Sequence, residues 1–167
     1  EWSTVSNVND VAHVLDGNWE ITPDGLRPTQ IAYDRVVAIG DMGWTEYEVA
    51  VPITINSIDQ TAFDRPDSIA PNLGLILRWQ GHTDNPPASA AGCLMPHCGW
   101  LPQGNNPNYA FTRENGQVTA QLRLDGGNDL HLTDPLNREL TFGTTYIWKA
   151  RSENLDDGRV RHTVKLW

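Results

Sequence analysis

The chain has 167 residues, of which 39% are hydrophobic and 20% are charged, and its formal net charge is −9 at pH 7. This length suits one domain with a sizeable core, and the composition excludes a disordered chain. No run of about 18 apolar residues occurs, so we expect no membrane insertion. The acidic balance, without a basic patch or stripe, also argues against a nucleic-acid partner.

The two ends of the sequence suggest a processed protein. The chain opens at Glu1 without an initiator methionine, and its last four residues, 164–167, still have the pattern of a strand. We therefore expect residues 1–167 to form a single domain that is either a mature chain or a module excised from a larger secreted protein. We expect it to be a monomer or part of a multidomain chain.

Alternation of apolar and polar residues with a period of two dominates the chain and predicts β-strands. The clearest example covers residues 44–55, where Tyr47, Val49 and Val51 share one face. Pro52 cannot donate to a neighbouring strand, so this strand bulges there or lies at the edge of a sheet. The same pattern predicts strands at 18–22, 30–37, 73–80, 117–124, 145–152 and 159–167.

The spacing of these strands predicts the fold class. Residues 154–158, Asn-Leu-Asp-Asp-Gly, have good turn chemistry for a hairpin between the last two strands. Helix signals are poor, with only a short turn near 8–14. Many strands and few helices in a chain of this length predict an all-β protein, an antiparallel β-sandwich or jelly roll.

One connection, residues 81–108, is long and rich in Pro, Gly, Asn and Ala. A loop of this length inside a domain is usually functional or disordered. It holds Cys93, Cys98 and Trp100, and in a secreted protein the two cysteines most simply form a disulfide. Two free thiols, or a metal bound with the help of His97, are the alternatives.

Three segments of the chain carry a resemblance to a known group of proteins. Residues 43–49 open a strand with Gly-Trp-Thr-Glu-Tyr, residues 74–79 read Gly-Leu-Ile-Leu-Arg-Trp, and the closing hairpin spans 143–150 and 160–167. Together they resemble the concanavalin A-like lectin and glucanase superfamily, including laminin G-like domains. The resemblance implies a jelly roll, and functions that range from lectins and carbohydrate-binding modules to glucanases, polysaccharide lyases and adhesive domains.

The catalytic motifs of two enzyme classes in this superfamily are only partly present in the sequence. Glucanases need three acids on one strand, and here Ala50 stands where Glu46 and Glu48 would need a third. Arg78, Gln80 and His82 resemble the Gln-x-His element of an alginate-lyase family. The matching Arg-Ser-Glu element, residues 151–153, follows it instead of preceding it. The sequence therefore does not favour an enzyme, and a lyase with His82 as base fits better than a glycoside hydrolase.

The favoured function is carbohydrate binding, which pairs aromatic faces with a few planar polar groups. An arginine would hold a carboxylate or neighbouring hydroxyls, a glutamine and a histidine would fix orientation, and a tryptophan would stack on a sugar face. The predicted ligand-binding residues are Arg78, Gln80, His82, Trp100 and Arg123.

The polar side chains of the predicted strands allow two interpretations. Polar side chains of three predicted strands would line a single face if those strands are neighbours, namely Arg78, Gln80, Gln121, Arg123, Lys149 and Arg151. The alternative is a solvated outer face with cross-strand pairs to Glu46 and Glu48. Trp79 and Trp148 share faces with apolar residues and are predicted to be core, and His162 is predicted to be a satisfied core histidine.

A calcium ion is the cofactor that the superfamily resemblance suggests. Asp16, Asn18 and Glu20 offer three oxygen ligands at alternate positions, although the glycine and the distal glutamate of a full calcium loop are missing. Taken together, the sequence predicts a secreted, extracellular, lectin-like module that binds a polysaccharide or another glycan. The alternatives are a lyase acting by β-elimination on a uronate-containing glycan, and an adhesive laminin G-like domain without a small ligand.

Overall fold

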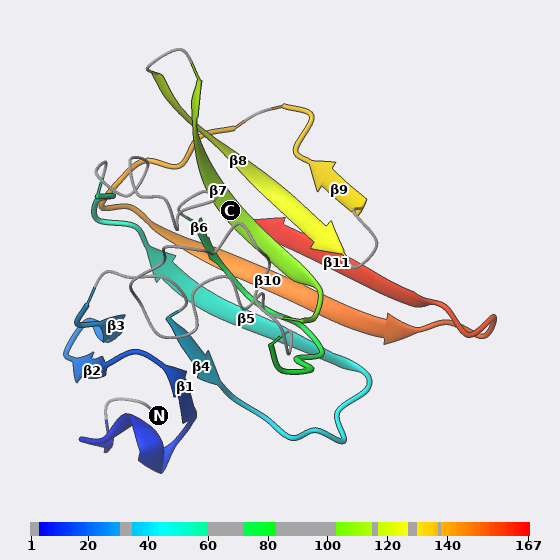
Figure 1. Cartoon of the computed structure of the whole chain (residues 1–167), viewed down its shortest axis with the longest axis horizontal. Coiled ribbons are helices and arrows are strands. Elements are labelled where there is room, and N and C mark those ends of the chain that lie inside the picture. Colours follow the sequence, from blue (N-terminus) through cyan, green and yellow to red (C-terminus); the bar gives the residue numbers. More distant parts are fainter. Residues whose placement is uncertain are drawn as a thin grey trace.

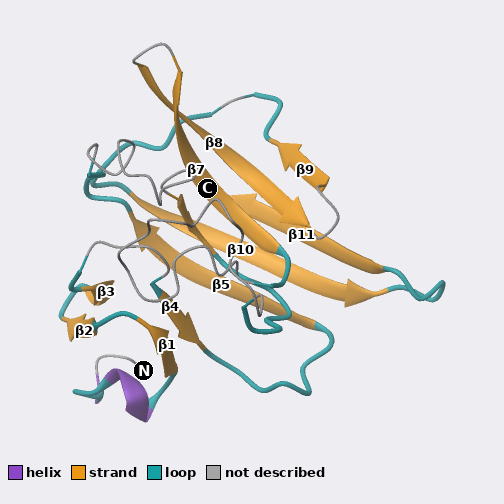
Figure 2. Ribbon diagram, in the orientation of Figure 1, coloured by secondary structure: helices purple, strands orange, loops and turns teal. Residues whose placement is uncertain are grey.

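The structure is a computed structural model that describes residues 4–30, 35–59, 72–82, 103–114, 117–126, 130–136 and 138–167. These residues form antiparallel strands, turns and loops, and their one named helix is the 3-10 turn η2 (Val8–Asp10) (Figure 2). The all-β prediction is therefore confirmed. Within the described residues, no helix has the length and apolar character that a membrane crossing requires.

The amino-terminal part contains two small sheets. Strand β1 (His13–Asp16) pairs with β4 (Val36–Ala38), and β2 (Trp19–Thr22) pairs with β3 (Gly25–Pro28) in a tight hairpin. The turn at residues 23–24 was expected. The strand predicted over 30–37 is confirmed at residues 36–37, where β4 begins, and residues 31–34 lie outside the described part of the chain. After the turn the chain returns at once as β3, because Gly25 accepts a φ of +128° and pairs directly with Thr22.

A three-stranded sheet contains β5 (Tyr47–Thr54), β10 (Thr145–Asn154) and β11 (Val160–Leu166), with β10 in the centre (Figure 1). The predicted hairpin between the last two strands is confirmed, with Asn154 opposite Val160. Strand β5 lies at an edge of this sheet, as the position of Pro52 requires of a residue without an N–H group.

A four-stranded sheet has the order β6-β7-β8-β9, formed by β6 (Asn72–Gly74), β7 (Asn106–Glu114), β8 (Gln117–Gly126) and β9 (Leu130–Thr133). Two of its strands differ from the prediction. Strand β7 was missed because it begins inside the stretch read as a loop, and β6 ends at Gly74, well before residue 80. Every named pairing in this sheet is antiparallel.

The two larger sheets contribute to one hydrophobic core. Tyr109 and Phe111 from β7 cluster with Ala120 from β8 and Trp148 from β10. The Tyr109 and Phe111 rings meet edge to face, with centroids 5.3 Å apart. Trp148 has no exposed surface, so the prediction that it is core is confirmed. Partly buried residues complete the cluster: Ile53, Ile55, Ile58, Leu75, Leu122, Leu140, Val164 and Leu166.

Replacing Trp148 with alanine tests this core. The variant leaves a large cavity between side chains of both sheets, so we expect the free energy of unfolding to fall by about 3–5 kcal/mol. Trp148→Phe keeps most of the apolar contact and removes a buried Nε1–H that has no acceptor among the described residues, so it should cost less than Trp148→Ala. Chemical denaturation measures both, with Trp167→Ala, an exposed tryptophan, as the matched control.

Candidate functional site

Arg78 lies in a β-bulge. Leu77 and Asn105 exchange two backbone hydrogen bonds, of 2.7 and 2.9 Å, and the next bond runs from the Gln80 N–H to the Gln103 carbonyl at 3.0 Å. Three steps along one segment therefore face two along the other, which is the definition of a bulge. Arg78 has a φ of +54°, in the left-handed region that non-glycine residues rarely adopt. The alternation predicted through 73–80 is broken at this residue.

The side chain of Arg78 holds the ends of two strands together. Its Nε donates to the Ser152 Oγ at 2.7 Å, and its Nη2 donates to the Asn154 Oδ1 at 2.5 Å and to the Thr45 carbonyl. Its backbone N–H donates to the Tyr47 Oη at 2.6 Å. Ser152 is fully buried. For the Nη1 group, no acceptor is found among the described residues.

The single polar face predicted from the sequence does not form. Arg78 bonds to Ser152 on the buried face of β10, whereas Lys149 and Arg151 alternate onto the opposite face of that strand. On that outer face the Lys149 Nζ pairs with the Glu48 carboxylate at 2.7 Å, and the Arg151 guanidinium pairs with a glutamate two residues on. The alternative of cross-strand pairs is therefore correct at Lys149 and Glu48.

The other predicted ligand residues are distributed over several places. Gln80 is exposed beyond the bulge, and His82 packs edge to face against Trp79, with ring centroids 4.9 Å apart. Trp79 is half-buried. Arg123 is half-buried on β8, opposite Asn108, in the four-stranded sheet, whereas Arg78 bonds to the three-stranded one. Outside the described residues lie Trp100 and the predicted disulfide partners, Cys93 and Cys98.

His162 lies directly opposite Ser152, on β11. It is half-buried, and its buried Nδ1 has no hydrogen-bond partner among the described residues. The prediction that this histidine is satisfied is therefore wrong at Nδ1. Burial lowers the pKa of His162, and the positive charge of Arg78 lowers it further.

The three predicted calcium ligands have different partners. The Asp16 carboxylate accepts from Arg35 at 3.0 Å, and the Glu20 carboxylate accepts from Arg27 at 2.5 Å. Asn18 is exposed, and its carbonyl accepts two bonds from Thr29. Among the described residues, no three His, Cys, Asp or Glu side chains come together as a metal site would need. This arrangement does not fit a calcium ion, because both carboxylates are already neutralised by arginines.

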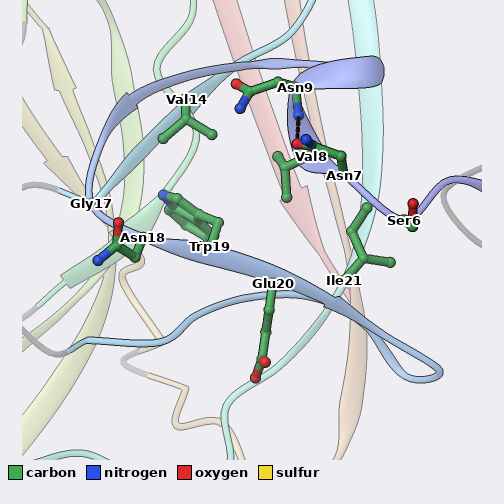
Figure 3. Close-up of a pocket in the computed structure, with 10 residues that line it drawn as sticks. All are labelled: Ser6, Asn7, Val8, Asn9, Val14, Gly17, Asn18, Trp19, Glu20 and Ile21. Carbon is green, nitrogen blue, oxygen red and sulfur yellow. Dashed lines mark hydrogen bonds between the residues drawn. The ribbon is translucent and has the colours of Figure 1, made fainter.

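A pocket of about 530 Å³ opens between η2 and β2 (Figure 3). Trp19 and Ile21 lie on the η2 side of β2, while the Glu20 side chain points away from η2. The indole Nε1–H of Trp19 donates to the Asp16 carbonyl at 2.9 Å, which fixes the ring. The full lining is Ser6, Asn7, Val8, Asn9, Val14, Gly17, Asn18, Trp19, Glu20 and Ile21.

Trp19, which lines the pocket, is not among the ligand-binding residues predicted from the sequence. The signal was present, since the indole lies between Asn18 and Glu20 in a segment that was read for its oxygen ligands alone. Only the tertiary structure brings η2, with Asn7 and Asn9, over this strand, because the contacts between η2 and β2 come from parts of the chain without a common pattern.

The fold and its sites define an all-β protein of antiparallel sheets with a polar, tryptophan-containing pocket. No family model, curated protein or solved structure matches the chain.

Removing the Arg78 side chain tests its structural role. Arg78→Ala leaves Ser152 buried without its partner, so we expect a loss of about 3 kcal/mol in the free energy of unfolding. Arg78→Gly loses the same bonds but relieves the left-handed backbone, so it should be about 1 kcal/mol more stable than Arg78→Ala. The exposed Arg138→Ala, whose carboxylate partner is on the same loop, is the control in urea denaturation. A stability of Arg78→Ala equal to that of the unsubstituted chain would contradict this role.

The depressed pKa of His162 predicts a pH dependence of stability. The unfolded histidine takes up a proton near its ordinary value of 6.5, whereas the folded one resists protonation. Its contribution is therefore fully present above pH 6.5 and is lost as the pH falls from there through the folded pKa. Unfolding free energies measured from pH 8 to pH 5 should decline less steeply in His162→Gln than in the unsubstituted chain. Equal slopes for the two proteins would refute the assignment.

Proposed function

We propose that this chain is a carbohydrate-binding module of a secreted protein, with its larger sheets arranged as a concanavalin A-like jelly roll. The shared core supports the fold, since Tyr109 and Phe111 from one sheet and Trp148 from the other pack in one cluster, as in two sheets that pack face to face. Antiparallel pairing of every strand supports it too.

The pocket beside Trp19 is the observation that carries the proposed function. Ligand sites are concave, and a volume of about 530 Å³ accommodates a small saccharide. Sugars present a C–H face to aromatic rings and hydroxyl groups to planar polar side chains. Trp19 supplies such a ring, and amides that both donate and accept come from Asn7, Asn9 and Asn18.

The charge of the pocket favours a neutral glycan. Of the described residues that line it, Glu20 is the one ionisable group, and Arg27 neutralises its carboxylate. The lining therefore offers no fixed cation to a uronate or sulfate group, and the net charge of −9 repels long polyanions. A neutral polysaccharide pays no such penalty, so it is the proposed ligand class.

An adhesive or structural laminin G-like domain is the second candidate. The outer face of the three-stranded sheet supports it, because the Lys149–Glu48 and Arg151–Glu153 pairs satisfy charges that a glycan would otherwise contact. A polar face paired with itself is what a domain without a small ligand would present. The pocket at Trp19 is the feature that this candidate leaves unused.

Retention on immobilised neutral polysaccharides tests the proposal. We expect the chain to be retained by at least one of β-glucan, xylan, galactomannan and galactan. Asn18→Ala removes an exposed side chain and keeps the backbone bonds to Thr29, so it should weaken binding about three- to tenfold without unfolding the protein. Trp19→Ala should weaken retention more than Asn18→Ala does at the same polysaccharide concentration.

The control and the alternatives are read from the same panel. Trp167→Ala, which removes an exposed tryptophan outside the pocket, should bind as the unsubstituted chain does. Binding that is insensitive to both pocket variants would exclude the pocket, and no retention on any polymer would favour the adhesive domain. Alginate and pectate are included with an absorbance readout, because new unsaturated ends that vanish in His82→Ala would establish the lyase. An arm with EDTA tests for calcium.

A further inference from the structure

A half-exposed tryptophan, Trp44, is held rigidly in the connection between β4 and β5. Its backbone N–H donates to the Asp41 carbonyl at 3.0 Å, and the Gly43 N–H donates to the Asp41 Oδ1 at 2.7 Å, which together close a tight turn. The indole packs over Gly40, where a Cβ atom would lie only 2.6 Å from the ring. With 54% of its surface exposed, Trp44 is fixed on one side and open on the other.

Trp44 is connected to Arg78 through Tyr47. The Trp44 and Tyr47 rings lie 6.1 Å apart at an interplanar angle of 52°, and the Tyr47 Oη accepts from the Arg78 N–H at 2.6 Å. The guanidinium of Arg78 also donates to the carbonyl of Thr45, the residue after Trp44. The Trp44 indole and the Arg78 guanidinium therefore lie at the same end of the three-stranded sheet. They are connected by the ring contact with Tyr47 and by the hydrogen bonds that Arg78 makes to Tyr47 and Thr45.

Two acceptor groups complete this assembly. The Glu46 Oε1 accepts from the Asn154 N–H at 3.2 Å, and the Asn154 Oδ1 accepts from Arg78 at 2.5 Å. Glu46 and Asn154 are exposed, and Arg78 is half-buried. The four side chains come from three separate parts of the chain, and all four reach the surface. Each polar group retains unused capacity, since Nη1 of Arg78 lacks an acceptor among the described residues and a carboxylate has about four lone-pair sites.

We propose that Trp44, Glu46, Arg78 and Asn154 form a second saccharide-binding site, which takes a neutral sugar ring stacked on the indole. A hydroxyl of the ring accepts from the Arg78 Nη1, and a neighbouring hydroxyl donates to the Glu46 carboxylate. The bulge explains why the chain keeps a non-glycine residue at a φ of +54°. It turns the Arg78 side chain out of the strand pattern and toward this end of the sheet.

The local charge selects the ligand class. Asp41 and Glu46 carry two negative charges beside the single positive charge of Arg78, in a chain whose net charge is −9. A uronate would meet this excess of negative charge, whereas a neutral sugar uses the carboxylates as hydrogen-bond acceptors. This site shares no residue with the Trp19 pocket. It rests on the proposed function only in taking the same class of ligand, and two such sites would let one polymer chain bind with avidity.

The test follows the indole N–H signals of the intact chain by NMR during titration with oligosaccharides of glucose, xylose, mannose and galactose. Trp44→Phe and Trp19→Phe assign the two signals of interest. We expect the Trp44 signal to shift in the unsubstituted chain and also in Trp19→Ala. Trp44→Ala should weaken binding at this site about tenfold, and Trp44→Phe should restore part of it. Trp167→Ala is the control, since the exposed fraction of this tryptophan, 58%, is similar to that of Trp44.

Each other outcome overturns a defined part of the proposal. A shift at Trp19 with a silent Trp44 overturns the second site and leaves the proposed function standing. A shift at Trp44 with alginate oligomers alone overturns the neutral ligand class. Binding that is equal in Trp44→Ala and the unsubstituted chain would show that Trp44 is no platform, and its exposed neighbours Ile39 and Met42 would then mark a protein contact. The absence of any shift at either tryptophan overturns both sites.

Discussion

The hydrogen bond from Arg78 to the buried Ser152 is the interaction on which the Trp44 end of the three-stranded sheet depends. A buried hydroxyl needs a partner, and here the partner arrives from a bulged segment rather than from the neighbouring strands. The same guanidinium bonds to Thr45 and Asn154, so the start of β5 and the end of β10 keep a single relative position. The turn that carries Trp44 is positioned as a result. His162, opposite Ser152, is left without a partner for its Nδ1 among the described residues.

Electrostatics and aromatic placement point to the same class of ligand at two separate places. The chain is strongly acidic, and the two arginines beside β1 and β2 form ion pairs with carboxylates, Arg27 with Glu20 and Arg35 with Asp16. What remains accessible is a set of amides and indoles, which bind hydroxyl groups and C–H faces without requiring charge. On the outer face of the three-stranded sheet the cation is likewise paired, since Lys149 forms an ion pair with Glu48. A neutral glycan is the ligand that such a surface can desolvate at low cost.

Periodicity was a reliable guide where burial alternates along an undisturbed strand. It located β5, β8 and the β10–β11 hairpin, and it identified Trp148 as core. Exposure alternates along β5 and most of β11, and β10 buries Trp148, Ala150 and Ser152 on one face. It failed at residues 73–80, where the bulge at Arg78 interrupts the alternation, and at β7, whose Pro-Asn-rich start reads as loop. No pattern along the chain marks a residue whose backbone is forced into the left-handed region by its partners.

The sequence by itself therefore determined the all-β class, the closing hairpin and the acidic character of the chain. These follow from local alternation, turn chemistry and charge, which act between residues close in the sequence. The tertiary structure alone decided that Arg78 bonds to Ser152, that Asp16 and Glu20 pair with arginines, and that Trp19 and Trp44 lie beside polar groups. Those relationships join segments that are distant along the chain, and their geometry is set by which side chain can satisfy a buried polar group once the sheets have packed.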